Sequence, residues 1–304
     1  MRILVTGGAG FIGSHLVGAL LEQGHEVSVF DLVDPVPARK HVKAIYERGD
    51  IRDVTLAAAV ARLAPEVIFH LAADADDRKS VLDPYTSASH NVFGTVNLFE
   101  AALHAGVRKV IFASTGVVYG LQKELPVTES AVPQPLTPYA VSKLAGEKYG
   151  HYYAHERGLL FAGLRIANVY GPLQDGSKEV GAIAVFTNYL LQHKAPFMNG
   201  DGLTTRDYIH VTDVVSAFLC LLSDEAHGMY NAGTGIQTTT QEVYSLVSQA
   251  LQSSVVPTPR PEVNDVLKHV ALSPVRLTTE FSWKPQVVFA EGVRSTVDFY
   301  KHLL

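Results

Sequence analysis

The chain has 304 residues, of which 47% are hydrophobic and 18% are charged, and its net charge is −5. That length can bury a large hydrophobic core, and the composition is that of a globular protein rather than a disordered one. The acidic balance provides no basic field of the kind that holds a phosphate backbone, which argues against binding to nucleic acid.

The only cysteine is Cys220, so the sequence excludes an internal disulfide and a cluster of cysteine metal ligands. It lies in an apolar run, where we expect it to be packed in the core. The histidines lack metal-ligand spacing such as HExxH, so we expect no metal site. No stretch reaches the roughly 18 apolar residues of a membrane span, and the chain begins with a strand rather than the apolar segment of a signal peptide. We expect a cytoplasmic protein in a reducing compartment, without membrane attachment.

Short β-branched runs alternate with helical patterns through the first half of the chain. Because continuous apolar strands separated by helices form parallel sheets covered on both faces, the pattern predicts a doubly wound α/β fold of the Rossmann type. Apolar residues at helical spacing mark the helices, and Pro138 is placed to start the last of them. The expected elements are strands at 3–5, 27–30, 67–69 and 110–113 and helices at 13–22, 92–105 and 139–153.

After about residue 169 the alternation loosens, and clusters of glycine and proline divide the sequence. This later part predicts a smaller, mixed α/β lobe. We expect two domains, at residues 1–168 and 169–304, with an approximate boundary and segments that interleave.

A glycine-rich turn joins the first expected strand to the first expected helix. Its sequence, TGGAGFIG at residues 6–13, places Gly7, Gly10 and Gly13 three residues apart. At such a turn the glycines permit tight backbone geometry and close approach of a pyrophosphate, and the amides at the helix start point at the anion. The turn therefore predicts a dinucleotide site in the first domain.

Asp31 follows the second expected strand, eighteen residues after the last turn glycine. A carboxylate at this point accepts hydrogen bonds from the adenosine ribose and repels a 2′-phosphate, which favours NAD over NADP. The basic residues at 39–40 lie too far along the chain to reverse that preference. Asp50 and Ile51 stand where the third strand should end, and they either lie against the adenine or form a plain loop cap.

Tyr139 and Lys143 are four residues apart and share one face of the last expected helix. A nearby ammonium favours the phenolate and lowers the phenol's pKa from about 10 toward neutrality. Lys143 can also hydrogen-bond the nicotinamide ribose. The pair therefore predicts a tyrosine base, and its position after a dinucleotide turn in the same domain strengthens that prediction.

The run ASTGVVYG at residues 113–120 follows an apolar strand and so lies at the carboxyl end of the sheet, where ligands bind in this fold. A hydroxyl there can hydrogen-bond the substrate's reacting oxygen and stabilise its proton. We assign this role to Thr115. Ser114 either assists it or caps the end of the strand.

Together with HLAA at 70–73 and NVFGT at 91–95, these motifs resemble the extended short-chain dehydrogenase/reductase family, in the branch of UDP-glucose 4-epimerase and its relatives. Two later motifs extend the resemblance over almost the whole chain, LRIANVYGP at 164–172 and GDGLTTRDYIHVTDV at 200–214. The resemblance implies an enzyme with NAD as cofactor, bound by the first domain, and a nucleotide sugar as substrate, bound by the second. It places these further residues at the cofactor: Phe11, Ile12, Leu71, Ala72 and Ala73.

The resemblance also implies contacts to the nucleotide diphosphate. Asn168 and Arg206 match family positions with that role, and charge-assisted bonding of arginine to phosphate gives it a physical basis. Arg260 resembles another phosphate-contacting arginine, although the Gly-Asp that usually follows is displaced here to Asn264-Asp265. His210 stands among strand residues, where a structural role is favoured over a catalytic one.

By resemblance, Tyr139 removes the proton of the sugar 4-hydroxyl while C4 passes a hydride to NAD, and an epimerase returns the hydride to the other face of the 4-keto sugar. Relatives that dehydrate the sugar carry Asp-Glu after the threonine, whereas this chain has Gly116-Val117. The glutamate of decarboxylases is also missing, and Asp31 argues against an NADP-dependent reductase. We expect a UDP-hexose 4-epimerase; the alternatives are a dehydratase, a decarboxylase or reductase of this family, and a dinucleotide-binding sensor without catalysis.

One departure from the family follows HLAA, where a glutamine and an apolar stretch are common. Here the chain carries Asp74, Asp76 and Asp77. They either select an unusual sugar or form a solvated helix start. The resemblance further implies a homodimer, because the helices at 91–104 and 139–153 occupy the positions that form a four-helix interface in relatives.

Overall fold

The computed structural model describes residues 1–177, 181–261 and 267–302. The chain divides into two compact units. The first comprises Met1–Gly120, Val132–Arg165 and Val215–Tyr230, and the second comprises Leu121–Ala131, Ile166–Val214 and Asn231–Leu304. Each unit is thus built from separate segments of the chain, and one break, between Arg165 and Ile166, lies close to the expected boundary after residue 168.

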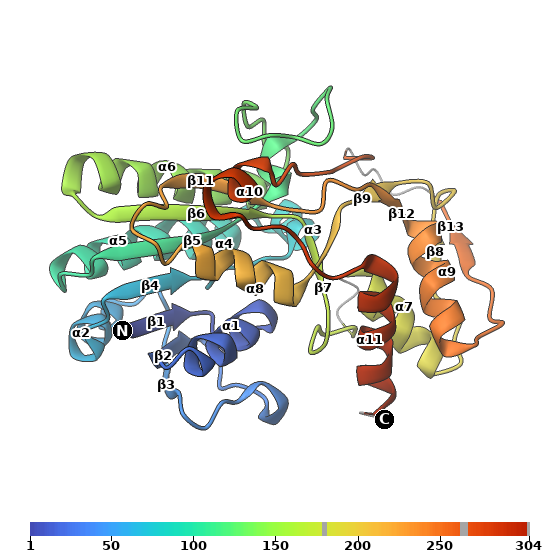
Figure 1. Ribbon diagram of the computed structural model, residues 1–304, viewed down its shortest axis with the longest axis horizontal. Coiled ribbons are helices and arrows are strands. Elements are labelled where there is room, and N and C mark those ends of the chain that lie inside the picture. Colours follow the sequence, from blue (N-terminus) through green and yellow to red (C-terminus); the bar gives the residue numbers. More distant parts are fainter. Residues whose placement is uncertain (178–180, 262–266, 303–304) are drawn as a thin grey trace. The chain divides into compact units, whose positions relative to one another are not determined.

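A seven-stranded sheet organises the first unit, with the strand order β11-β6-β5-β4-β1-β2-β3 (Figure 1). β1 pairs in parallel with both β2 and β4, and the pairs β2–β3 and β4–β5 are parallel as well. The order 3-2-1-4-5-6 is that of doubly wound dinucleotide-binding sheets, so the predicted Rossmann-type fold is confirmed. The strands are β1 (Arg2–Thr6), β2 (Glu26–Asp31), β3 (Ile45–Arg48), β4 (Val67–His70), β5 (Lys109–Thr115), β6 (Leu160–Ile166) and β11 (Gly228–Ala232).

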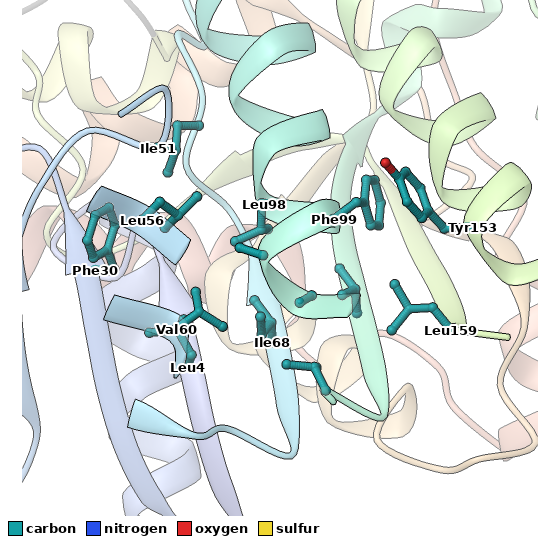
Figure 2. Close-up of a cluster of buried hydrophobic side chains, with 14 of the residues drawn as sticks. Leu4, Phe30, Ile51, Leu56, Val60, Ile68, Leu98, Phe99, Tyr153 and Leu159 are labelled. Atoms are coloured by element: carbon teal, nitrogen blue, oxygen red, sulfur yellow. The ribbon is translucent and has the colours of Figure 1, made fainter. Parts of the chain in front are cut away.

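Helices α2 (Thr55–Leu63), α5 (Gly94–His104) and α6 (Pro138–Arg157) pack on one face of this sheet. Figure 2 shows their buried side chains, with Leu98 beside Ile68 and Phe99 stacked on Tyr153 at a centroid distance of 4.9 Å. On the other face, α1 (Phe11–Glu22) lies against β1 and β2. Successive residues of a strand point to opposite faces, so these strands are apolar on both sides, as their uninterrupted hydrophobic runs predict.

Helix α6 has clear start and stop signals. The Thr137 side chain accepts a hydrogen bond from the Ala140 amide, Pro138 occupies the first turn, and Gly158 ends the helix with φ of 72°. A Cβ at Gly150 would lie 2.2 Å from the Phe161 ring, so the absence of a side chain lets α6 approach the sheet closely. The helix therefore exceeds the expected span of 139–153 at both ends.

The region between β4 and β5 differs from the expected single helix at 92–105. It contains two short helices, α3 (Asp77–Leu82) and α4 (Pro84–Ala88), then the π-helical turn η2 (Ser89–Phe93), and only then α5. Side-chain caps begin the two short helices, since Asp76 accepts from the Lys79 amide and Asp83 from the Thr86 amide. The 3₁₀ turns η1 (Pro37–Arg39) and η3 (Gly116–Tyr119) follow β2 and β5.

The second unit is a smaller mixed α/β assembly, as the sequence predicted. Three two-stranded ladders form from β7 (Asn168–Tyr170) with β10 (Tyr208–His210), β9 (Thr205–Arg206) with β12 (Thr238–Thr239), and β8 (Phe197–Asn199) with β13 (Thr258–Arg260). Its helices are α7 (Ala182–Leu191), α9 (Thr240–Leu251), α10 (Val275–Phe281) and α11 (Phe289–Lys301), and α8 (Val211–Cys220) contains residues of both units. The core includes Phe186, Val243 and Val297. Among the described residues, no helix is long and apolar enough to cross a membrane.

Candidate functional site

The glycine-rich turn between β1 and α1 has little room for side chains. Gly7 has φ of 75° and its amide donates to the Phe30 carbonyl at 3.0 Å; a Cβ there would lie 2.6 Å from the Ala72 nitrogen. A Cβ at Gly13 would lie 2.2 Å from the Gly7 oxygen. The backbone is therefore compatible only with glycine at both positions, in the turn before α1 and in the first turn of that helix.

The start of α1 suits an anion. Gly10 is the N-cap residue and provides no side-chain cap, and the first turn of the helix contains no acidic residue. The first amides of a helix lack intrahelical partners and carry the positive end of the helix dipole. These residues therefore fit the pyrophosphate of a dinucleotide.

Asp31 ends β2 beside this turn. Its Oδ2 accepts from the Ala9 amide at 3.0 Å and its Oδ1 accepts from the Val33 amide at 3.2 Å. Burial raises the pKa of the Asp31 carboxyl, and the backbone hydrogen bonds from Val33 and Ala9 oppose that effect. The carboxylate is thus held next to the glycine turn, where the sequence placed the ribose-binding group.

Asp50 and Ile51 follow β3. The Arg52 guanidinium binds the Asp50 carboxylate through Nε at 3.0 Å, and this hydrogen bond lowers the pKa of Asp50. The Ile51 side chain is buried in the cluster with α2 and α5, and its carbonyl accepts from Asn97 Nδ2 at 2.7 Å. Both residues have structural partners, and their contact with an adenine stays a prediction.

A buried chain of neutral polar groups leads from the glycine turn toward α6. Thr6 Oγ1 lies 2.7 Å from His70 Nδ1, and His70 Nε2 lies 3.0 Å from Thr95 Oγ1. Because the Thr95 hydroxyl donates to the Asn91 carbonyl at 2.6 Å, it must accept from His70 Nε2, which leaves Nδ1 to accept from Thr6. Burial, with a smaller effect of the Lys143 charge, lowers the pKa of His70 to about 3, so this imidazole is neutral.

The chain continues through Asn91 to the helix that carries Tyr139. Asn91 Nδ2 donates to the Asp74 carbonyl at 2.9 Å and to Ser142 Oγ at 3.0 Å, and Ser142 Oγ donates to the Tyr139 carbonyl at 2.7 Å. In the sequence, His70 and Asn91 stood only in the motifs HLAA and NVFGT and had no assigned role. Their signal was a polar residue in an otherwise apolar buried run, as in VIFH at 67–70.

The structure brings Tyr139 and Thr115 together. A hydrogen bond from Thr115 lowers the pKa of the Tyr139 phenol, but burial and, after it, the Asp77 charge raise that pKa well above its usual range. The predicted lowering toward neutrality is therefore not seen. The reason is that burial and nearby carboxylates disfavour the phenolate, and the Lys143 ammonium is not among the groups that shift Tyr139.

Lys143 lies on the same helix, only 3% exposed, with its Nζ 4.4 Å from the centre of the Phe112 ring. Burial lowers the pKa of Lys143 to about 7, against an opposing effect of the Glu147 charge. Ser114, one residue before Thr115, donates its hydroxyl proton to Glu147 Oε1 at 2.5 Å. This bond gives Ser114 a structural partner, and its assistance to Thr115 stays a prediction.

The three acidic residues after HLAA have different partners. Asp76 caps α3 by accepting from the Lys79 amide at 2.9 Å, and Asp74 pairs with the Lys79 ammonium at 3.2 Å. Asp77 accepts a short hydrogen bond from the hydroxyl of Thr137, the N-cap residue of α6. Asp76 and Asp77 thus stand at the start of α3, and Asp77 also connects it to the helix of Tyr139. A role of the three residues in sugar choice stays a prediction.

In the second unit, Asn168 begins β7 with an exposed side chain, and its amide donates to the Asp207 carbonyl at 2.8 Å. Arg206 ends β9, and its Nη1 donates to the Thr205 carbonyl at 2.8 Å. Arg260 ends β13 with its guanidinium 3.2 Å from the centre of the Phe197 ring. The contacts of these residues with a diphosphate stay predictions.

Two further residues of this unit have partners of their own. The Asp207 carboxylate is buried and accepts from the amides of Leu272, Thr234 and Gly235, which fixes the turn after β11. His210 lies in β10, with Nδ1 2.7 Å from Thr212 Oγ1. Among the described residues, no group of three or more His, Cys, Asp or Glu is placed to hold a metal ion.

Comparison with known proteins gives consistent matches. Residues 3–233 match the model of the NAD dependent epimerase/dehydratase family. A UDP-glucose 4-epimerase of Mycolicibacterium smegmatis is 40% identical over 99% of both chains. The crystal structure of a Thermotoga maritima UDP-glucose 4-epimerase with UDP-glucose has a TM-score of 0.96 at 36% identity, covering 100% of this chain and 99% of that one. A Thermus thermophilus UDP-glucose 4-epimerase in complex with NAD has a TM-score of 0.95 at 38% identity, covering 100% of both.

Proposed function

The chain belongs to the NAD-dependent epimerase/dehydratase family, and from that membership we propose that it is a UDP-hexose 4-epimerase with Tyr139 as its base. The resemblance noted in the sequence, the enzyme class and NAD as the cofactor are confirmed by these matches. The observation that carries the proposal is that Thr115 lies close enough to Tyr139 to lower the pKa of its phenol, and that Gly116-Val117 rather than a pair of acids follows Thr115 in the chain.

The first unit supports the binding of NAD through the glycine turn and Asp31. Glycines 7, 10 and 13 leave space at the start of α1, the helix amides face the pyrophosphate, and Asp31 takes the ribose hydroxyls. Ala72 lies against Gly7 and closes the other side of the turn. When bound, NAD supplies a hydride acceptor that can return the hydride to either face of the sugar C4.

Residues of the chain carry out the proton transfer at the sugar 4-hydroxyl. Tyr139 takes the proton from the sugar 4-hydroxyl and returns it once the hydride has been delivered to the opposite face. Thr115 hydrogen-bonds the same oxygen and holds it in line with the phenol. Lys143, one turn further along α6, donates its ammonium protons to the nicotinamide ribose. With no acid pair beside Thr115, no group is placed there to remove water from the sugar, which favours epimerisation over dehydration.

In the second unit, Asn168, Arg206 and Arg260 are proposed to bind the nucleotide diphosphate. All three stand at strand ends, and the two guanidiniums can make charge-assisted bonds to phosphate. Firm binding of the diphosphate leaves the sugar free to turn, which is the condition for hydride return to the opposite face. The cytoplasm is the proposed location, since a chain with one cysteine fits a reducing compartment.

A homodimer is also proposed. Large apolar side chains are exposed on η2, α4 and α6, including Phe93 at 71% and Tyr85 at 88%, and these three elements contact one another. Exposed apolar side chains on neighbouring helices are typical of a protein interface, and a second copy can cover them through the same helices. Light scattering should give twice the mass of 32.9 kDa, and Phe93→Asp should give the monomer mass.

The experiment that tests the activity is an NMR time course of the purified protein, without added cofactor, mixed separately with UDP-glucose, UDP-N-acetylglucosamine and UDP-glucuronate. Formation of the C4 epimer in any sample supports a tightly held NAD that is regenerated in each cycle, and it names the sugar. A product that lacks water or carbon dioxide, or turnover only with added NAD, contradicts the epimerase proposal.

A further inference from the structure

A buried charged cluster lies at one end of the predicted site. Arg165 on β6 binds Glu147 on α6 in a bidentate ion pair, Nε to Oε1 at 3.0 Å and Nη2 to Oε2 at 2.7 Å. Arg165 also donates to the Tyr119 hydroxyl at 2.8 Å, and Ser114 donates to Glu147 Oε1 at 2.5 Å. Glu147 and Arg165 are only 3% and 5% exposed.

Stability alone does not account for this pair. Burying two charges carries a desolvation cost that their attraction barely offsets, and apolar residues of similar volume are often as stable. We therefore looked for a further group on which the Glu147 carboxylate acts, besides its partners Arg165 and Ser114.

That group is Lys143, one helical turn before Glu147 on the same face of α6. Lys143 is buried against the Phe112 ring, and no carboxylate of the described residues lies within ion-pair distance of its ammonium. The Glu147 charge is the one influence that favours the charged form of Lys143 against burial. Because the Glu147 carboxylate acts on Lys143 without an ion pair to it, the ammonium stays available to a ligand.

The other titratable groups near Lys143 leave this role to Glu147. His70 on β4 is neutral, with both ring nitrogens hydrogen-bonded. Asp74 and Asp77, before and at the start of α3, act on Tyr139. The remaining groups on packed elements have partners of their own: Glu100 of α5 with Tyr153, and His90 of η2 with the Thr86 carbonyl.

We propose that Glu147 is a positioning residue of the site: it keeps the Lys143 ammonium charged and takes the only proton of Ser114, while Arg165 holds its carboxylate in place. Ser114 then acts toward the site as a hydrogen-bond acceptor only, and Thr115 is the hydroxyl that can donate to the substrate oxygen. The proposal rests on the role of Lys143 in the proposed function, in which its ammonium donates to the nicotinamide ribose.

The test is a direct titration of Lys143 in the purified protein, followed by NMR of selectively ¹⁵N-labelled lysine side chains. The Lys143 signal is identified by its loss in Lys143→Met. We expect the isosteric but neutral Glu147→Gln to lower the titration midpoint by about one pH unit, within the usual range for loss of an opposite charge. Glu147→Asp, which shortens the side chain but keeps its charge, should leave the midpoint near the wild-type value.

Because Glu147→Gln leaves Arg165 buried without its partner, the double variant Glu147→Gln/Arg165→Met is measured beside it. It removes both charges, so it should fold and still show the lowered midpoint. In the epimerase assay the alkaline limb of kcat should move to lower pH by the same amount, with KM for UDP-glucose unchanged. A folded double variant with the wild-type midpoint overturns the proposal. The titration needs no turnover, so an inactive wild-type protein would contradict the proposed function and leave this result standing.

Discussion

Two polar networks reach helix α6, and they are built in opposite ways. The chain from Thr6 through His70 and Asn91 is neutral, and its donors are paired with buried acceptors. The cluster of Glu147 and Arg165 is ionic, bidentate and equally buried. A neutral network fixes geometry, because none of its groups carries a charge near neutral pH. An ionic network also creates an electrostatic field, and here that field acts on Lys143, the buried lysine of the predicted site.

Both networks reach the helix that carries Tyr139, the proposed base. Loss of the Tyr139 hydroxyl is expected to have the largest effect on the rate. Tyr139→Phe removes the proton acceptor while keeping the ring, so kcat should fall by about 10² to 10⁴, the usual contribution of a positioned acid or base. The rate of epimer formation by NMR measures this, with circular dichroism and bound NAD as controls for folding. An active Tyr139→Phe variant would show that another residue is the base.

The neutral network is expected to respond strongly to acid. The pKa of folded His70 is about 3, below its ordinary 6.5, so between these values the unfolded chain binds one more proton than the folded chain. The stability linked to His70 is therefore complete above pH 6.5 and is lost as the pH falls toward 3, by up to about 1.4 kcal/mol per pH unit. Urea unfolding at several pH values measures this slope. His70→Gln, which keeps a donor and an acceptor without titrating, should flatten it.

Breaking each network sharpens the contrast at neutral pH. His70→Leu leaves the hydroxyls of Thr6 and Thr95 without their buried partner, and each such loss costs about 1 to 3 kcal/mol. Replacing the ionic pair by Glu147→Gln/Arg165→Met should cost less, since an ion pair exchanged for neutral groups is often near neutral in stability. The free energies of unfolding of the two variants decide this, and a larger loss in the double variant would reverse the comparison.

The sequence predicted most where the backbone itself forms the site. The glycine turn, Asp31, Thr115 and the helix of Tyr139 stand at sheet and helix ends that apolar periodicity locates well. It did not predict the partners that connect them, because His70, Asn91 and Ser142 come from three separate segments that only the fold brings together. The helix expected at 92–105 was likewise incomplete, since side-chain caps and a π-helical turn divide the preceding residues into short pieces.

For the same reason the expected pKa of Tyr139 was wrong in direction. Spacing along α6 showed Lys143 four residues away, but burial of the phenol and the charge of Asp77 depend on how α3 packs against α6. Asp77 is distant from Tyr139 in the sequence but close to it in the fold. Periodicity can assign a residue to one face of a helix, but it does not show which charged residues pack against that face.

The smallest expected effect concerns that charge. Asp77→Asn removes the largest influence after burial that raises the pKa of Tyr139, so the acid limb of kcat should move to lower pH by less than about one unit. Asp76→Asn is the matched control, because asparagine still caps α3 and this carboxylate is not among the groups that shift Tyr139. If both variants move the pH profile equally, the acidic segment acts through its net charge. If only Asp77→Asn does, two carboxylates act on α6, Asp77 at its N-cap residue Thr137 and Glu147 two turns after Tyr139.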